Sequence, residues 1–457
     1  MNDMEHFHNN NSVTSSSVTT EELNTARRLI TRRINEHRLS VGISLALSAY
    51  SDTHFICHGN SDPLASKPTT PDTVYEIGSV SKVLTGLLLS LLSLEGLVSL
   101  DTPVRDVLPA GLIFPDTELA TATLFDLASH YSGLPSVPPS ILSALLQNPY
   151  RDFDVCAMKD YLKSSQTVTP PGTQFEYSNT GFTLLGIILE HITGEDYKNL
   201  VRQRIFRPLG MTDTWADLPK SEEHRFSQGF DINGETTLPW DTGIYFPAGG
   251  WRSTVRDLSR FILAASGQSS SPLTDAFTLM LDRTRATDDP DTQIGLGWFI
   301  TDNNLIWHNG MTGGFSSMIG FRRDTGRGVV ALSNQSSVAG VDDIGLYLLD
   351  HNNPLFPPPP ATRDHNVSPL ILRMYEGEYH SETNDKFRVF IQNERLYLCP
   401  EGQGRIWFRA LSDDTFTSPG AGADIRFRTE KKGSIVQLEL SQDGECLTAV
   451  KVNKNQS

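Results

Sequence analysis

The chain has 457 residues, 38% of them hydrophobic and 20% charged, which excludes a collagen, a coiled coil and a largely disordered protein. It carries 38 Lys and Arg against 54 Asp and Glu, a formal net charge of −16, and it contains no basic run with interleaved aromatic residues. Because such an acidic chain repels phosphate backbones, nucleic-acid binding is not expected.

The N-terminal stretch is rich in Asn, Ser and Thr, and we expect residues 1–20 to form a disordered arm. The stretch has no basic region followed by an apolar one, so no secretory signal is expected. The longest apolar run, Val83–Leu94, is shorter than the ~18 residues that a membrane span needs. The sequence therefore predicts a cytoplasmic protein without membrane association.

Residues 21–351 alternate between helical and strand patterns. The first and last strands lie far apart in the sequence with helices between them, which predicts a mixed α/β core whose sheet joins both ends of this region. The apolar helix near residue 80 follows a short strand and Gly78, and Gly194 is a natural stop for a later helix. The expected helices are Glu21–His37, Ser79–Glu95, Leu124–Ser129 and Thr180–Thr193, and the expected strands are Val41–Ala49, Val74–Ile77, Leu305–His308, Ser316–Phe321 and Gly328–Asn334.

A change of pattern follows this region. Asn352–Pro360 ends in four consecutive prolines, which fit neither a helix nor a central strand, so residues 352–368 are expected to be an extended linker. Residues 369–457 contain short strand candidates separated by turns, which is typical of a small antiparallel barrel or sandwich. The candidates are Tyr375–Tyr379, Phe387–Ile391, Arg395–Cys399, Ile406–Ala410, Ile425–Arg428, Ile435–Leu440 and Leu447–Val452.

The first candidate for chemistry is Ser79-Val80-Ser81-Lys82. Positions i and i+3 share one face of a helix, so the Lys82 amine could take the proton of the Ser79 hydroxyl if burial lowers its pKa. The helix N-terminus would favour the anion that then develops. In the alternative interpretation Ser79 is only a helix cap and Lys82 a surface residue.

Two further segments carry polar residues near glycines or helix starts. Tyr177 and Asn179 precede a helix, where a tyrosine hydroxyl can relay a proton and an amide can hold a substrate. His308 and Gly310 lie on a late strand, where the glycine permits close backbone approach and the imidazole can bind a carboxylate or move a proton. Taken singly, each segment is better explained as a turn.

Metal and cofactor sites are not expected. His54 and His58 are four residues apart, but no carboxylate cluster accompanies them. Gly313-Gly314 lacks the Lys and the Ser or Thr of a phosphate-binding loop.

The three segments in this order resemble the serine β-lactamase and penicillin-binding-protein superfamily, and above all its class C-like branch of esterases, D-aminopeptidases and fungal acyltransferases. Further similar stretches are Tyr75–Ser79, Ser129–Pro135, Arg207–Met211 and Pro247–Gly250, and the resemblance covers roughly residues 35–340. It implies a β-lactamase-like catalytic core, with an antiparallel sheet flanked by helices, followed by a small lipocalin-like barrel.

The resemblance also implies roles. Ser79 would be the acylated nucleophile, Lys82 its partner in proton transfer, and Tyr177 a second acid or base. Asn179 would orient the substrate, and the backbone N–H groups of Ser79 and Met311 would form the oxyanion hole, which stabilises the charge of the tetrahedral intermediate.

One departure from the family pattern bears on the substrate. The third motif is commonly Lys-Thr-Gly in β-lactamases, whereas this chain has His308-Asn309-Gly310, as in some esterases and D-aminopeptidases. This departure favours an ester or amide other than a β-lactam. We expect His308 to be mostly neutral beside Lys82, with a hydrogen bond to Tyr177 or to the substrate.

Three functions remain open at this stage. The first is a serine hydrolase of an ester or amide in a small molecule or peptide. The second is an acyltransferase or thioesterase-like cyclase of fungal secondary metabolism, which would share every catalytic residue and could have a synthetase partner. The third is a non-catalytic binding protein with the same fold.

Overall fold

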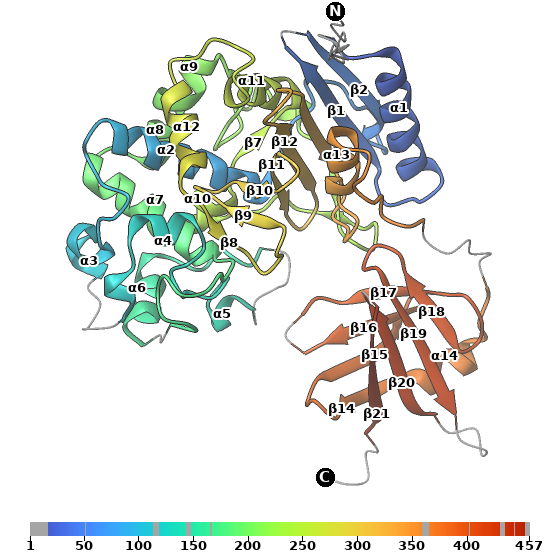
Figure 1. The fold of residues 1–457 in the computed structure, drawn as a ribbon. Coiled ribbons are helices and arrows are strands. Elements are labelled where there is room, and N and C mark those ends of the chain that lie inside the picture. The colour runs from blue at the N-terminus through green and yellow to red at the C-terminus, as the bar shows by residue number, and fades with distance from the viewer. Residues whose placement is uncertain are drawn as a thin grey trace, which may run out of the picture.

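The computed structural model describes residues 17–50, 52–112, 118–142, 148–164, 167–358, 365–401, 403–429, 435–442 and 444–452. In Figure 1 a large sheet lies between two sets of helices, and a separate barrel, coloured orange to red, lies below it. Most of the expected N-terminal arm, residues 1–16, is outside the described residues. The part that is described packs on the protein, because Val18 is buried and Thr19 caps the first helix.

The large sheet has nine antiparallel strands in the order β3-β2-β1-β13-β12-β11-β10-β9-β8. The N-terminal strand therefore pairs with one that lies nearly 300 residues later, with Ile43 opposite Ser333, as the sequence pattern predicted. The strands are β1 Gly42–Ala49, β2 Asp52–Asp62, β3 Lys67–Pro68, β8 Arg285–Ala286, β9 Thr292–Ile294, β10 Phe299–Thr301, β11 Leu305–Met311, β12 Ser316–Arg322 and β13 Gly328–Ser333.

Both faces of this sheet are buried, which explains the nearly continuous apolar character of its central strands. Helices α1 (Thr20–Asn35) and α13 (Asp342–Leu349) cover one face, where Ile43 and Leu45 of β1 point. Ala46 points to the other face, which packs against α11 (Val255–Ala265) and the main helical layer. Alternate residues of one strand therefore belong to two different cores.

The helical layer contains most of the residues between the two halves of the sheet. Its α-helices are α2 Ser81–Leu94, α3 Val104–Val107, α4 Leu124–Ala128, α5 Pro139–Leu142, α6 Val155–Ser164, α7 Asn179–Thr193, α8 Tyr197–Val201, α9 Arg207–Leu209, α10 Phe246–Gly249 and α12 Thr274–Asp282. Short turns are η1 Gly78–Val80, η2 Ala110–Leu112, η3 Glu118–Thr121, η4 Arg202–Phe206, η5 Glu223–Arg225 and η6 Gly243–Tyr245. Two small two-stranded sheets pair β4 (Tyr75–Glu76) with β7 (Arg252–Ser253), and β5 (Gly229–Phe230) with β6 (Thr236–Thr237).

The C-terminal part is a closed antiparallel barrel with its own apolar core. Helix α14 (Pro369–Tyr375) precedes it, and Leu372 and Tyr375 of this helix pack into the barrel core. The strands are β14 Gly377–Ser381, β15 Lys386–Gln392, β16 Arg395–Pro400, β17 Ile406–Ala410, β18 Thr415–Ser418, β19 Ala423–Thr429, β20 Ile435–Gln442 and β21 Glu445–Lys451. Sequence analysis missed β18 and α14.

This architecture confirms the expected fold class, an antiparallel sheet with flanking helices followed by a small barrel. The proposed limits of the linker stay a prediction: residues 352–358 have neither helix nor strand, and residues 359–364 lie outside the described part. All four cysteines are free thiols. Among the helices of the described ranges, none is both long and apolar enough to cross a bilayer.

Candidate active site

Ser79 and Lys82 lie where the chain enters the central helix of the helical layer. Ser79 is in the tight turn η1, which Gly78 opens with a positive φ of 49°, a conformation that glycine adopts without strain. Lys82 follows in the first turn of α2 and is fully buried, whereas Ser79 is partly exposed. The hydroxyl therefore reaches a pocket while the amine lies behind it.

Lys82 is held by three oxygen atoms from different elements. Its Nζ lies 2.9 Å from Ser79 Oγ, 2.6 Å from Asn179 Oδ1 and 2.9 Å from the backbone oxygen of Ala248. No carboxylate is among these partners. Because desolvation penalises the charged amine, the pKa of Lys82 is well below its ordinary value.

Three oxygen partners can accept from the three N–H bonds of an ammonium, and they also suit the neutral amine that the lowered pKa favours. An uncharged amine has two N–H bonds and one lone pair. Asn179 Oδ1 and the Ala248 carbonyl can accept only, so they take the two N–H bonds, and the lone pair is left for the Ser79 hydroxyl proton. In this state the geometry prepares Lys82 to deprotonate Ser79.

Tyr177 lies beside this pair, just before helix α7. Its ring centroid is 4.9 Å from Lys82 Nζ and 4.3 Å from the His130 ring. Burial raises the pKa of Tyr177 above its ordinary value, and a hydrogen bond with Ser79 opposes that shift. The hydroxyl therefore keeps its proton at neutral pH and is placed to donate it.

Strand β11 passes Ser79 so closely that two glycines are required. A Cβ on Gly310 would lie 2.2 Å from the Ile77 oxygen and 2.9 Å from the Ser79 nitrogen, and a Cβ on Gly78 would lie 2.8 Å from the Met311 nitrogen. Side chains at either position would push the strand away. The glycines thus let the backbone around Ser79 and the backbone around Met311 approach closely, as the expected oxyanion hole requires.

His308 lies three residues before Met311 and is fully buried. Burial, and then the nearby Lys82, lower its pKa to about 3, so the imidazole is neutral at physiological pH, as predicted. Its Nδ1 donates to the backbone oxygen of Asn309 at 2.5 Å. Its Nε2 has no hydrogen-bond partner among the described residues, so Tyr177 is not that partner and a substrate atom remains the alternative.

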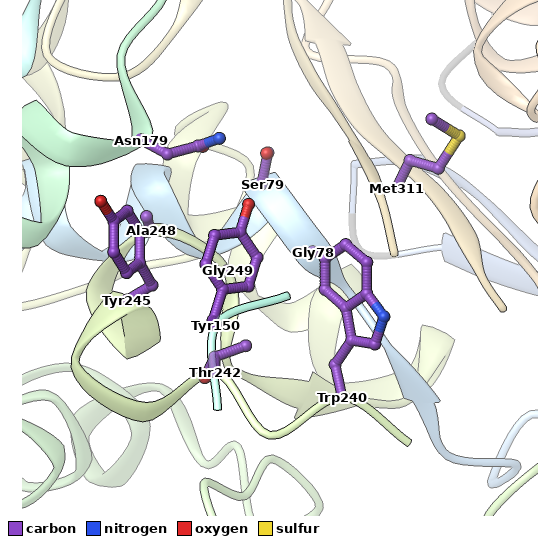
Figure 2. Close-up of a pocket in the computed structure, with 10 residues that line it drawn as sticks. All are labelled: Gly78, Ser79, Tyr150, Asn179, Trp240, Thr242, Tyr245, Ala248, Gly249 and Met311. Carbon is purple, nitrogen blue, oxygen red and sulfur yellow. The ribbon is translucent and has the colours of Figure 1, made fainter. Parts of the chain in front are cut away.

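A pocket with about 380 Å³ of empty space opens in front of Ser79. Figure 2 shows an aromatic wall in it, formed by Tyr150, Trp240 and Tyr245, with the Tyr150 hydroxyl pointing toward Ser79. Tyr150 stacks on Tyr245 at 4.7 Å and meets the edge of Trp240 at 5.4 Å. These three residues were not predicted from the sequence: Tyr150 and Trp240 lie outside helices and strands, Tyr245 ends the short turn η6, and none belongs to a recognised motif.

The structure thus brings together all seven residues that the sequence singled out: Ser79, Lys82, Tyr177, Asn179, His308, Gly310 and Met311. Their catalytic and binding roles stay predictions. The Met311 side chain is about half exposed, so only its backbone faces the nucleophile. His54 pairs with Asp52 and His58 with Asn35, and no group of residues in the described ranges could hold a metal ion.

Comparison with known proteins identifies the family of the catalytic part. The model of the beta-lactamase family matches residues 27–351. The chain belongs to the beta-lactamase family. A "Beta-lactamase" from Escherichia coli (strain K12) is 24% identical over 352 residues, which cover 68% of this chain and 88% of the relative. "Protein flp" from Staphylococcus aureus (strain MRSA252) is 27% identical over 295 residues, 61% of this chain, but this chain spans only 56% of its length.

Solved structures are similar to this family member in fold. A beta-lactamase/D-alanine carboxypeptidase from Pseudomonas syringae has a TM-score of 0.63 at 23% identity, covering 73% of this chain and 100% of that one. An octameric penicillin-binding protein homologue from Pyrococcus abyssi has a TM-score of 0.62 at 22% identity. The latter covers 93% of this chain and 99% of its own, so the similarity extends beyond the region that the family model matches.

Proposed function

We propose that this protein is a serine hydrolase that cleaves an ester or amide bond of an uncharged small molecule or peptide through an acyl-enzyme at Ser79. The observation that carries the proposal is the buried Lys82 amine, 2.9 Å from Ser79 Oγ and without a carboxylate partner among the described residues. A lysine in this environment is a base and not a structural cation.

Acylation follows from these positions. Lys82 Nζ takes the proton as Ser79 Oγ bonds to the substrate carbonyl carbon, and the carbonyl oxygen becomes an oxyanion that the N–H groups of Ser79 and Met311 stabilise. When the tetrahedral intermediate collapses, the bond to the leaving group breaks. The Tyr177 hydroxyl gives its proton to the leaving group and regains one from Lys82. A water molecule then attacks the ester carbon along the reverse proton route and releases the acid.

The charge of the site points to the substrate class. His308 is neutral, and no arginine lines the pocket in the described part of the chain. A substrate carboxylate would therefore lose its hydration without gaining a permanent cation. The aromatic wall supplies apolar contact instead. Both features support uncharged esters or amides over penicillins and cephalosporins.

Acyl transfer is the second candidate, because the aromatic wall beside Ser79 could also bind an organic acceptor. Only the acceptor differs between the two reactions: water in hydrolysis, and an alcohol or amine in transfer. An acyltransferase or cyclase would take its acyl group from a synthetase partner.

The test is intact-mass detection of an adduct on Ser79 after mixing with a panel of neutral aryl esters, thioesters and amino amides. Hydrolysis predicts a transient adduct that decays in buffer alone. Transfer predicts an adduct that is stable in buffer and is released by an added alcohol or amine. Absence of any adduct with the whole panel would contradict both.

A further inference from the structure

The barrel contacts the catalytic part at Val338, whose nitrogen donates to the Gly420 oxygen at 2.9 Å, and at the tip of the β5–β6 hairpin. Glu235, in this tip, places Oε2 2.9 Å from Arg405 Nη2 and Oε1 3.4 Å from Arg395 Nη1. The Tyr397 hydroxyl donates to the same Oε1 at 3.3 Å. One carboxylate of the catalytic part thus meets two arginines and a tyrosine of the barrel.

The same tip also contacts the backbone of the barrel. Asn233 Oδ1 accepts a hydrogen bond from the Trp407 nitrogen at 2.7 Å, and its Nδ2 donates to the Arg405 oxygen at 3.2 Å. A Cβ on Gly420, in the loop after β18, would lie 2.0 Å from the Ile232 oxygen. The barrel therefore contacts the hairpin closely with its backbone as well as with its charges.

The base of the hairpin lies against the active site. The Phe230 nitrogen donates to the Gly314 oxygen at 3.2 Å, and a Cβ on Gly314 would lie 2.2 Å from Thr237 Oγ1. Gly313 and Gly314 form the turn that follows Met311 of strand β11. The hairpin is thus packed between the barrel and the turn next to the expected oxyanion hole.

Trp240 completes this connection. A Cβ on Gly313 would lie 2.6 Å from Trp240 Nε1, so the turn rests on the indole ring that forms part of the pocket wall. The Trp240 backbone is fixed separately, since its nitrogen donates to Glu76 Oε1 at 2.8 Å. The ring can therefore respond to the turn while the main chain stays in place.

We propose that Glu235 is a positioning residue through which the barrel holds the hairpin and the Gly313–Gly314 turn against the Trp240 ring, so that the barrel sets the width of the substrate pocket. This inference rests on the proposed function and refines its substrate class. The selected substrates are those whose uncharged aryl or alkyl group packs on Trp240. The kcat/KM of substrates too small to reach this ring does not depend on the barrel contact.

The test reverses the charge of Glu235. Glu235→Arg places three guanidinium groups together and should separate the hairpin from the barrel. For p-nitrophenyl phenylacetate over p-nitrophenyl acetate, we expect the ratio of kcat/KM to fall about tenfold, the effect of losing one pocket contact. The rate with the acetate should change less than about twofold, because Ser79 and Lys82 are untouched.

Exchanging the two charges tests whether the lost selectivity can be restored. A variant that had simply unfolded would not be restored by a second substitution in the barrel. Glu235→Arg combined with Arg405→Glu should restore most of the ratio, whereas either change alone should lower it. Glu378→Arg, at an exposed glutamate of strand β14, is the matched control and should behave as the unmodified protein. A ratio unchanged in Glu235→Arg, or a swap that restores nothing, would overturn the proposal.

A spectroscopic measurement separates this proposal from the proposed function. Acrylamide quenching of Trp240 fluorescence, taken as the difference from Trp240→Phe, should increase in Glu235→Arg and return in the swapped pair. If no substrate acylates Ser79, the proposed function fails, yet the quenching still tests the contact. Unchanged quenching in Glu235→Arg would show that the barrel does not position the Trp240 ring, regardless of the activity measured.

Discussion

The protein contains two polar clusters that use similar groups in opposite ways. At Lys82 one cation is fully buried among neutral oxygens, and its pKa is lowered. At Glu235 the carboxylate and its two arginines are each more than one third exposed. Burial favours the neutral, basic form of an amine, because the protein interior does not solvate the ammonium form. Exposed groups stay charged, but water screens their ion pairs, so these pairs orient the contact and add little stability.

Replacing Ser79 should have the largest effect on acylation. Ser79→Ala should abolish the acyl adduct seen by intact-mass analysis, while the melting temperature stays close to that of the unmodified protein, since Ser79 is partly exposed. Ser93→Ala, later in the same helix α2, is the control and should acylate normally. Turnover of the same substrate by the Ser79→Ala protein would remove the mechanism.

Changing the base tests whether the neutral state of Lys82 matters. Lys82→Arg keeps a cation at the site but cannot accept a proton, so acylation should slow by roughly 10²–10⁴-fold, as much as in Lys82→Ala. Tyr177→Phe should slow it similarly, and the double variant should be little worse than either one. Rapid single-turnover acylation by Lys82→Arg would show that the amine acts only as a charge.

His308 should set the preference for substrate charge. His308→Lys introduces a cation in the middle of β11, so the ratio of kcat/KM for a carboxylate-bearing ester over a neutral ester should rise by about tenfold. His308→Gln, which stays neutral, is the control and should keep the original preference. An unchanged ratio in the lysine variant, or efficient penicillin hydrolysis by the unmodified protein, would show that this position does not select charge.

The same histidine should make stability depend on pH. Its pKa is about 3 in the folded protein and near 6.5 when unfolded, so the unfolded chain binds the extra proton between these values. The free energy of unfolding should therefore decrease as pH falls from ~6.5 toward ~3, by about 1.4 kcal/mol per pH unit. Urea unfolding at several pH values should show a shallower slope for His308→Gln. Equal slopes would place the imidazole in contact with water.

A change in the exposed cluster around Glu235 should have the smallest effect, a small change in the free energy of unfolding. Arg405→Gln removes one ion pair whose partners are both partly exposed, so the free energy of unfolding should change by less than about 1 kcal/mol. The Tyr397 and Arg395 contacts with Glu235 remain in this variant. A loss of several kcal/mol by urea titration would mean that the barrel contact is a structural requirement and not an orienting one.

Much of the catalytic part could be predicted from local pattern. The apolar helix after Gly78, the stop at Gly194 and the three late strands appear close to their expected limits, because periodicity and glycine conformation act within a few residues. The resemblance of the motifs around Ser79, Tyr177 and His308 to those of a known family, and not local pattern, implied one shared site. Strand β18 and helix α14 were missed, and both are short. The longer β2 and α11 of the catalytic part were also not among the expected elements.

The sequence by itself determined which groups could react. A serine and a lysine three residues apart at the start of a helix lie on the same face, so their side chains can meet. Tertiary structure alone decided the state of those groups. Burial lowers the pKa of Lys82, and close passage of β11 requires glycine at positions 78 and 310. The aromatic wall and the contact between Glu235 and the barrel join residues ninety or more positions apart. Such contacts depend on how the chain packs, which local patterning does not specify.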